Sequence, residues 1–269
     1  MSSRRLDVGD AELRAMTADL DQAHRDTFPA AAAQLTDLGR DLGRDLGRGL
    51  GARAANRRGV LLGGLTAVGA GVLAACGSSS SGGGSNTGGM GSAAAATTGG
   101  RYTGDLKVVA LAAALENLAV AAYSAVLTKA GAGTYGTVPP AIGEFVTVVR
   151  SQHTDHGKAW NGVLASAKLP EITGAPLTIA AGEVAKLNQA KTLPEVARIA
   201  LDLETGAAQT YLSALTNVTN TTGISTAATI APVEAMHAAV LRYILGDYPV
   251  PDSFLGTTAA IAPTVLTAA

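Results

Sequence analysis

The chain has 269 residues, of which 47% are hydrophobic and 15% are charged, and its formal net charge at pH 7 is −1. This length allows one or two domains, and the basic residues form no patch, which argues against nucleic acid or a strongly anionic partner. Residues 77–100 are nearly all Gly, Ser, Ala, Thr and Asn, a composition that buries too little apolar surface to fold. We therefore predict a flexible tether over residues 76–101, with one folded domain after it.

The segment before the tether contains a four-residue repeat. Residues 38–51 read LGRDLGRDLGRGLG, which places a glycine in every turn of any helix, so we expect a poor helix there. One interpretation is a cytoplasmic segment on the membrane surface. The other, which we favour, is an over-long start of an export signal or a start codon assigned too early. In either case we predict that residues 1–75 are a leader that is removed.

The end of this leader has the pattern of an export signal. Residues 57–76 read RRGVLLGGLTAVGAGVLAAC, an apolar run shorter than the ~20 residues of a membrane-spanning helix and ending in small residues. The segment resembles a bacterial lipoprotein signal. That resemblance implies cleavage before Cys76, a lipid on its thiol, and a mature chain held on the outer face of the bacterial cytoplasmic membrane. The alternative is an uncleaved transmembrane anchor.

The arginine pair that opens this segment suggests a route of export. Arg57 and Arg58, followed by Gly-Val-Leu-Leu, resemble a twin-arginine signal, which carries proteins that are already folded. The general export pathway is the alternative.

From Tyr102 onward, long apolar-periodic segments are broken by Gly and Pro, which predicts helices. We place them at 103–130, 139–168, 194–219 and 226–246. The connections 131–138 and 220–225 are short, whereas 169–193 is long enough to run the length of a bundle. One long crossover between the second and third helices predicts an all-α, ferritin-like antiparallel four-helix bundle over residues 102–250, with a C-terminal tail over 251–269.

The two halves of this region match each other. LENLAVAAYSAVL (115–127) aligns with LETGAAQTYLSAL (203–215), and HTDHGKAWNGVL (153–164) aligns with EAMHAAVLRYIL (234–245). The alignment pairs Glu116 with Glu204, Tyr123 with Tyr211, His156 with His237, and His153 with Glu234. We therefore expect a duplicated helix pair.

The paired polar residues suggest a metal site. Burying an unpaired carboxylate among apolar neighbours costs several kcal/mol. Shared metal ions would neutralise the carboxylates of these glutamates. The layout is that of ferritin-like carboxylate proteins, in which two helices give one Glu each and two give Glu-x-x-His. The chain resembles the bacterial ferritin-like lipoproteins across roughly residues 102–250. The resemblance implies two irons, with these ligands: Glu116, His156, Glu204, Glu234 and His237.

One position departs from the family pattern, because His153 stands where the family has Glu. The change removes one of the carboxylates that bridge two metals. Three interpretations stay open: His153 is itself a ligand, which favours zinc or a mixed site; the site holds a single metal; or the site is a relic.

Each candidate residue also has an ordinary structural interpretation. Of the four histidines in the chain, His24 lies in the predicted leader, and the other three lie on the two matched segments, a clustering that favours metal ligation. Tyr123 and Tyr211 are expected to pack behind the ligands as core tyrosines, with a redox role as the alternative. Trp160 is expected to pack. Pro232 favours a helix that begins nearby, which would leave Glu234 in its first turn.

These residues favour a membrane-anchored protein that binds iron, manganese or zinc, as one or two ions, in the bundle core. Oxidation of Fe(II) by O2 at a two-metal centre is the activity such a site suggests, and whether there is turnover stays open. The runner-up is a non-catalytic envelope lipoprotein with a degenerate site that binds a partner; a metal carrier with a more exposed site is a third alternative. The expected partners are the membrane, through Cys76, and metal ions, without nucleic acid. The sequence lacks GxSxG and HExxH motifs, so hydrolase chemistry is not indicated.

Overall fold

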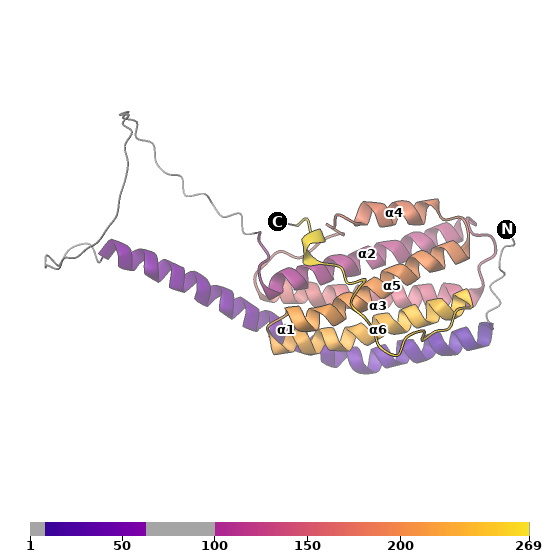
Figure 1. Cartoon of the computed structure of the whole chain (residues 1–269), viewed down its shortest axis with the longest axis horizontal. Helices are drawn as coiled ribbons and strands as arrows, with labels where there is room; N and C mark the ends of the chain where they lie inside the picture. Colours follow the sequence, from indigo (N-terminus) through magenta and orange to yellow (C-terminus); the bar gives the residue numbers. More distant parts are fainter. Residues whose placement is uncertain (1–8, 63–99, 269) are drawn as a thin grey trace, which may run out of the picture. The chain divides into compact units, whose positions relative to one another are not determined.

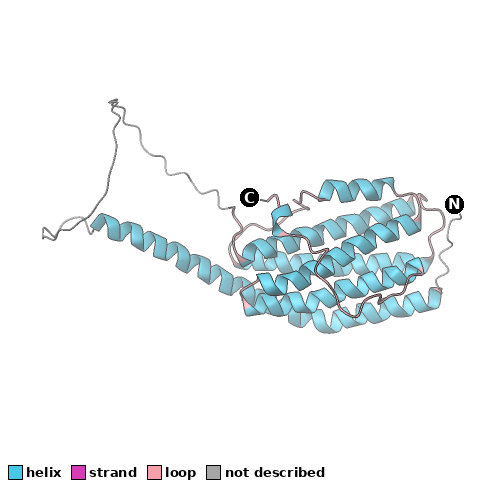
Figure 2. Cartoon of the chain, in the orientation of Figure 1, coloured by secondary structure: helices cyan, strands magenta, loops and turns pink. Residues whose placement is uncertain are grey.

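The computed structural model describes residues 9–62 and 100–268, with side chains described outside 49–62. These residues form α-helices and one short 3-10 helix, and no strand is present among them (Figure 2). The all-α prediction is therefore confirmed. Cys76 and most of the predicted tether lie outside the described residues.

Four long helices form a bundle (Figure 1). Their bounds are α2 (Asp105–Gly131), α3 (Pro140–Ser166), α5 (Leu193–Asn217) and α6 (Thr221–Leu245). Helix α2 packs along α3, and α5 packs along α6, so each matched half is a helix pair with a short connection. The long crossover between the pairs carries a further short helix, α4 (Ala180–Gln189).

The start of α6 corrects one expectation. Asn220 caps the helix, because its Oδ1 accepts hydrogen bonds from the N–H groups of Thr222 and Gly223, and such a cap stabilises a helix start by about 1 kcal/mol. Pro232 therefore lies inside α6 and does not begin it. Glu234 consequently sits in the middle of the helix, fully buried, where burial of the surrounding apolar residues outweighs the backbone hydrogen bond that a proline removes.

The apolar core consists of two clusters, one toward each end of the bundle. One contains Leu111, Leu164 and Ile230, and the other contains Phe145 and Ile244. Along α3, α5 and α6, buried polar residues separate the two clusters, and on α2 the buried Glu116 lies next to Leu118, near the boundary between the clusters. Helices α2 and α6 are apolar and long enough to cross a membrane by length and composition alone, but 56% of the most apolar window of each is buried within the protein, as in core helices.

The C-terminal segment packs back onto the domain. The 3-10 helix η1 (Pro263–Val265) is followed by a β-bridge between Leu177 and Leu266, and the Thr178 N–H donates to the Val265 carbonyl at 2.9 Å. The end of the chain is thereby fixed to the crossover.

An additional helix, α1 (Asp10–Leu62), was not predicted. Its residues up to Leu46 belong to the same compact unit as residues 100–269. Four of its leucines, Leu13, Leu20, Leu35 and Leu38, are at most 4% exposed. Removal of residues 1–75 stays a prediction, but while they are attached, α1 contributes to the core.

The glycine repeat lies within this helix, so the expectation of a poor helix was wrong. A Cβ at Gly39 would lie 2.5 Å from the Ser166 Cβ and 2.8 Å from the Val163 carbonyl oxygen, and one at Gly43 would lie 3.1 Å from the Ala167 Cα. Glycines four residues apart share one helix face, so they form a stripe without side chains against which the end of α3 packs. This close approach, together with the buried leucines, offsets the low helix propensity of glycine, which is about 1 kcal/mol per residue.

The first prediction compares two glycines of this repeat. Gly39→Ala should release α1, because the added methyl group has no space, and overpacking of this kind costs about 1–3 kcal/mol. Gly47 is the control, because a methyl group added there would have nothing within 4 Å, and Gly47→Ala should stabilise the helix by about 0.5–1 kcal/mol. Hydrogen exchange of the amides of residues 20–46 measures both effects. Equal protection in the two variants would contradict the packing role of Gly39.

Candidate metal centre

The polar segments of the four long helices meet in one layer between the two apolar clusters. Six residues form it, each at most 2% exposed: Glu116 from α2, His153 and His156 from α3, Glu204 from α5, and Glu234 and His237 from α6. The structure thus brings together all six residues that the sequence suggested as metal ligands.

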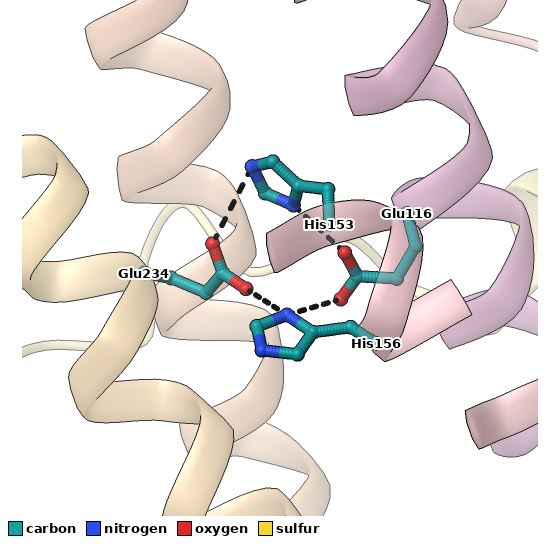
Figure 3. A group of neighbouring side chains, drawn as sticks. All are labelled: Glu116, His153, His156 and Glu234. Carbon is teal, nitrogen blue, oxygen red and sulfur yellow. Dashed lines mark hydrogen bonds and ion pairs between the residues drawn. The ribbon is translucent and has the colours of Figure 1, made fainter. Parts of the chain in front are cut away.

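A first group consists of Glu116, His153, His156 and Glu234, which each offer one ligand atom within 4.8 Å of the others (Figure 3). The His153 Nδ1 lies 2.7 Å from the Glu116 Oε2. The His156 Nδ1 lies 3.1 Å from the Glu234 Oε1 and 3.6 Å from the Glu116 Oε1. One ion among these atoms would replace the histidine–carboxylate contacts.

A second group consists of His153, Glu204, Glu234 and His237, with the same spread of ligand atoms. The His153 Nε2 lies 3.1 Å from the Glu204 Oε1, and the His237 Nδ1 lies 3.2 Å from the Glu204 Oε2 and 3.1 Å from the Glu234 Oε2. The two groups share His153 and Glu234, which are the residues that the internal repeat pairs with each other. The layer is therefore laid out as two adjoining sites with two shared positions.

The two tyrosines join the halves reciprocally. The Tyr123 hydroxyl of α2 donates to Glu204 of α5, and the Tyr211 hydroxyl of α5 donates to Glu116 of α2. Trp160 does more than pack: its indole N–H donates to the Tyr211 hydroxyl at 2.8 Å. These bonds fix the orientation of both carboxylates.

Gln152 is a residue of the centre that the sequence analysis missed. It is 1% exposed, and its Oε1 lies 2.8 Å from the His237 Nε2, while its Nε2 donates to the Leu20 carbonyl of α1 at a long 3.5 Å. Because a carbonyl only accepts, the amide nitrogen faces Leu20 and the amide oxygen faces His237, so the His237 Nε2 carries the proton. A metal ion that replaced the proton of the His237 Nδ1, which faces Glu204 and Glu234, would then meet the lone pair of this nitrogen. A glutamine beside His153 on a helix with apolar periodicity was the available signal.

His24 of α1 is a second residue near the centre that the sequence did not indicate, because the sequence places it in the predicted leader. Its side chain is buried, with 6% exposed, stacks on Phe28 with ring centroids 4.6 Å apart, and contacts the His156 ring at 5.3 Å. Burial and the neighbouring His156 lower the pKa of His24 to about 4. No sequence pattern links this residue to the repeat.

Opposite charges balance in the layer. Burial would raise the pKa of Glu116, but the charge of His156 and a hydrogen bond with His153 outweigh it and lower the pKa to about 2. Burial would lower the pKa of His156, but the nearby carboxylate of Glu116 and the hydrogen bond with Glu234 outweigh it and raise the pKa to about 9. The carboxylates of Glu204 and Glu234 likewise raise the pKa of His153 well above its usual value, against the effect of burial.

The donor set fits a transition metal. Three carboxylates and three imidazoles are ligands that iron, manganese and zinc all accept, and a bound cation would replace the protons that the histidines otherwise carry. A largely apolar pocket adjoins the layer between α2 and α5, lined among others by Leu115, Ala119, Leu203, Ala207 and Ile261 together with Glu116 and Glu204.

A four-helix bundle with a buried layer of Glu and His on all four helices defines the class of carboxylate–histidine bundle proteins. Residues 104–247 match the family described as ferritin-like domain. This match spans more than half of the 269 residues, and the chain belongs to that family, which confirms the ferritin-like part of the resemblance. None of the curated proteins and none of the solved structures compared with the chain matches it.

The second prediction concerns pH and the metal-free protein. The raised pKa of His156, about 9 against 6.5, gives a stabilisation that is complete below pH 6.5 and lost as the pH rises through about 9. The pKa of Glu116 is lowered to about 2 against 4.5. The stabilisation that follows from this shift is present above pH 4.5 and is lost as the pH falls toward 2. With a chelator present, Tm should be highest between about pH 4.5 and 6.5 and fall by pH 9. A Tm that is constant from pH 6 to 9 would contradict these charge pairs.

Proposed function

We propose that the protein binds one or two transition-metal ions in the polar layer, with iron as the first candidate and manganese or zinc as alternatives. The observation that carries the proposal is the pair of four-residue groups whose ligand atoms lie within 4.8 Å of one another, between two apolar clusters. Buried carboxylates are kept only where a partner compensates their desolvation, and a metal ion is the strongest partner available.

The two groups suggest a division of roles. Glu116 and His156 would hold one ion, and Glu204 and His237 the other. Glu234 belongs to both groups and would be shared by the two ions. His153 turns its Nδ1 toward Glu116 and its Nε2 toward Glu204, which favours a ligand role for His153 among the three interpretations of this departure from the family.

A pair of irons bound here would supply Fe(II)/Fe(III) redox chemistry toward O2. The chain itself contributes three things. Tyr123 and Tyr211 hold the two terminal carboxylates, the apolar clusters exclude bulk water, and the apolar pocket between α2 and α5 would admit a small apolar molecule. Whether the protein is an enzyme depends on this chemistry.

A second candidate is a non-catalytic lipoprotein in which the layer is a hydrogen-bonded relic. It is favoured by one observation: each of the three carboxylates has a histidine partner within about 3.2 Å, which compensates its charge without an ion. A metal carrier is less favoured, because handing on ions requires an exposed site, and all six residues are at most 2% exposed.

For the cellular location, we propose that the protein is exported and anchored to the outer face of the bacterial cytoplasmic membrane through lipidated Cys76. The support is the sequence of residues 57–76. Cleavage before Cys76 would also take α1 from the bundle, and with it the contacts of His24 and Leu20 to the polar layer.

The third prediction tests the metal proposal by stoichiometry. After anaerobic loading with Fe(II), Glu116→Gln and Glu204→Gln should each lower the metal content by about one ion per chain, whereas Glu234→Gln, which affects both groups, should abolish binding. Asp202→Asn, an exposed carboxylate one half-turn from Glu204, is the matched control and should bind as the wild type does. Elemental analysis gives the readout, and wild-type metal content in Glu234→Gln would favour the relic.

The fourth prediction tests the proposed lipidation and export route. Radiolabelled fatty acid should be incorporated into the wild-type chain and not into Cys76→Ser, because the thiol is the acceptor. Replacing Arg57 and Arg58 together by Lys should block export by the twin-arginine route. Label that persists in Cys76→Ser would refute lipidation, and export of the double-lysine variant would point to the general pathway.

A further inference from the structure

We propose that, in the chain that still carries residues 1–75, His24 of α1 is a positioning residue of the metal centre, which accepts a hydrogen bond from the Nε2–H of His156 and so holds the His156 Nδ1 toward the metal. This inference rests on the proposed metal-binding function and adds to it a residue outside the ferritin-like match, which begins at residue 104.

The argument starts from an unpartnered atom. The His156 Nδ1 faces Glu116 and Glu234, while its Nε2 lies on the other side of the ring (Figure 3). That Nε2 is buried and has no hydrogen-bond partner among the described residues. A histidine that binds metal through one nitrogen almost always donates its other N–H to an acceptor, so an acceptor is expected at this point.

The internal repeat shows why the acceptor is missing from the bundle. The equivalent nitrogen of His237 is bonded to Gln152, the residue before His153. The repeat pairs Gln152 with Val233, which is buried beside the centre and has no side chain that accepts a hydrogen bond. The half that contains His156 therefore needs an acceptor from elsewhere.

Helix α1 places His24 at this position. The His24 Nε2 is the second buried nitrogen without a partner among the described residues, and the His24 and His156 ring centroids are 5.3 Å apart. Because a ring nitrogen lies ~1.1 Å from its centroid, two nitrogens that face each other across this distance would be about 3 Å apart, the length of a hydrogen bond. A neutral imidazole has one lone pair to offer, so the His24 Nε2 can accept the proton of the His156 Nε2 once the His24 ring turns this nitrogen toward His156.

Phe28 packs against both histidine rings and keeps them side by side. It stacks on His24 at an interplanar angle of 14° and also contacts the His156 ring at 5.1 Å. The same helix orients the other histidine of the pair, since the Leu20 carbonyl fixes the amide of Gln152. Helix α1 thus offers an acceptor to His156 and orients Gln152, the acceptor of His237, and a chain that lost residues 1–75 would lose both contributions.

The experiment uses the full chain with Cys76→Ser, which keeps α1 attached, and Co(II) as the probe. His24→Phe keeps an aromatic ring on Phe28 but removes the acceptor, His24→Gln retains one, and Gln152→Leu removes the acceptor of His237 for comparison. Each variant is titrated with Co(II), and NMR follows the exchangeable N–H proton of each ligand histidine. Hydrogen exchange of the amides of α1 checks that the helix stays docked.

The expected result is that His24→Phe weakens Co(II) binding about 10- to 100-fold, as Gln152→Leu does, and that the His156 N–H exchanges with solvent faster. His24→Gln should recover most of the affinity and the slow exchange. Wild-type affinity and exchange in His24→Phe with α1 docked would overturn the inference while leaving the metal site intact. Absence of Co(II) binding by the unsubstituted chain would overturn the proposed metal site and this inference together.

Discussion

The structure depends on the balance of three carboxylates and three imidazoles in a layer closed to water. Burying one of these carboxylates without a partner would cost several kcal/mol. Every helix that carries a buried carboxylate must therefore pack where a histidine can reach it. This requirement sets the relative register of α2, α3, α5 and α6, because a shift by one residue would turn a charged group into one of the apolar clusters. A change of register by one residue would disturb the packing of the many alanines of α2 and α6 less than it would disturb the polar layer.

The internal repeat explains the arrangement of the polar layer. The positions at which the two halves carry different residues explain how the two groups of ligands differ. Glu116 and Glu204 are equivalent, and each is bonded to the tyrosine of the other half, so neither helix pair completes the centre by itself. Three of the differences between the halves lie in or beside the polar layer: His153 stands for Glu234, Gln152 for Val233 and Trp160 for Leu241. The first changes the charge of a shared position, and the second leaves one histidine without an acceptor in the bundle.

Much of this followed from the sequence. The four long helices, the crossover and the meeting of the six polar residues were predictable, because apolar periodicity and an internal repeat are local patterns that the helical geometry translates directly into faces. The place of α1 was not predictable in this way. A glycine in every turn lowers helix propensity, and only the close approach of α3 to Gly39 and Gly43 shows its purpose. Gln152, His24 and the interior position of Pro232 likewise depend on contacts between segments distant in the chain or on a cap, which periodicity does not record.

The central claim is that the polar layer is a metal centre and not a set of buried ion pairs. X-ray diffraction from crystals of the iron-loaded full chain, collected above and below the iron absorption edge, tests it most directly. The account predicts one or two anomalous peaks inside the layer, within about 2.0–2.2 Å of oxygen or nitrogen atoms of the Glu and His side chains. Crystals that contain iron only at the protein surface, with the six residues bonded to one another, would contradict it.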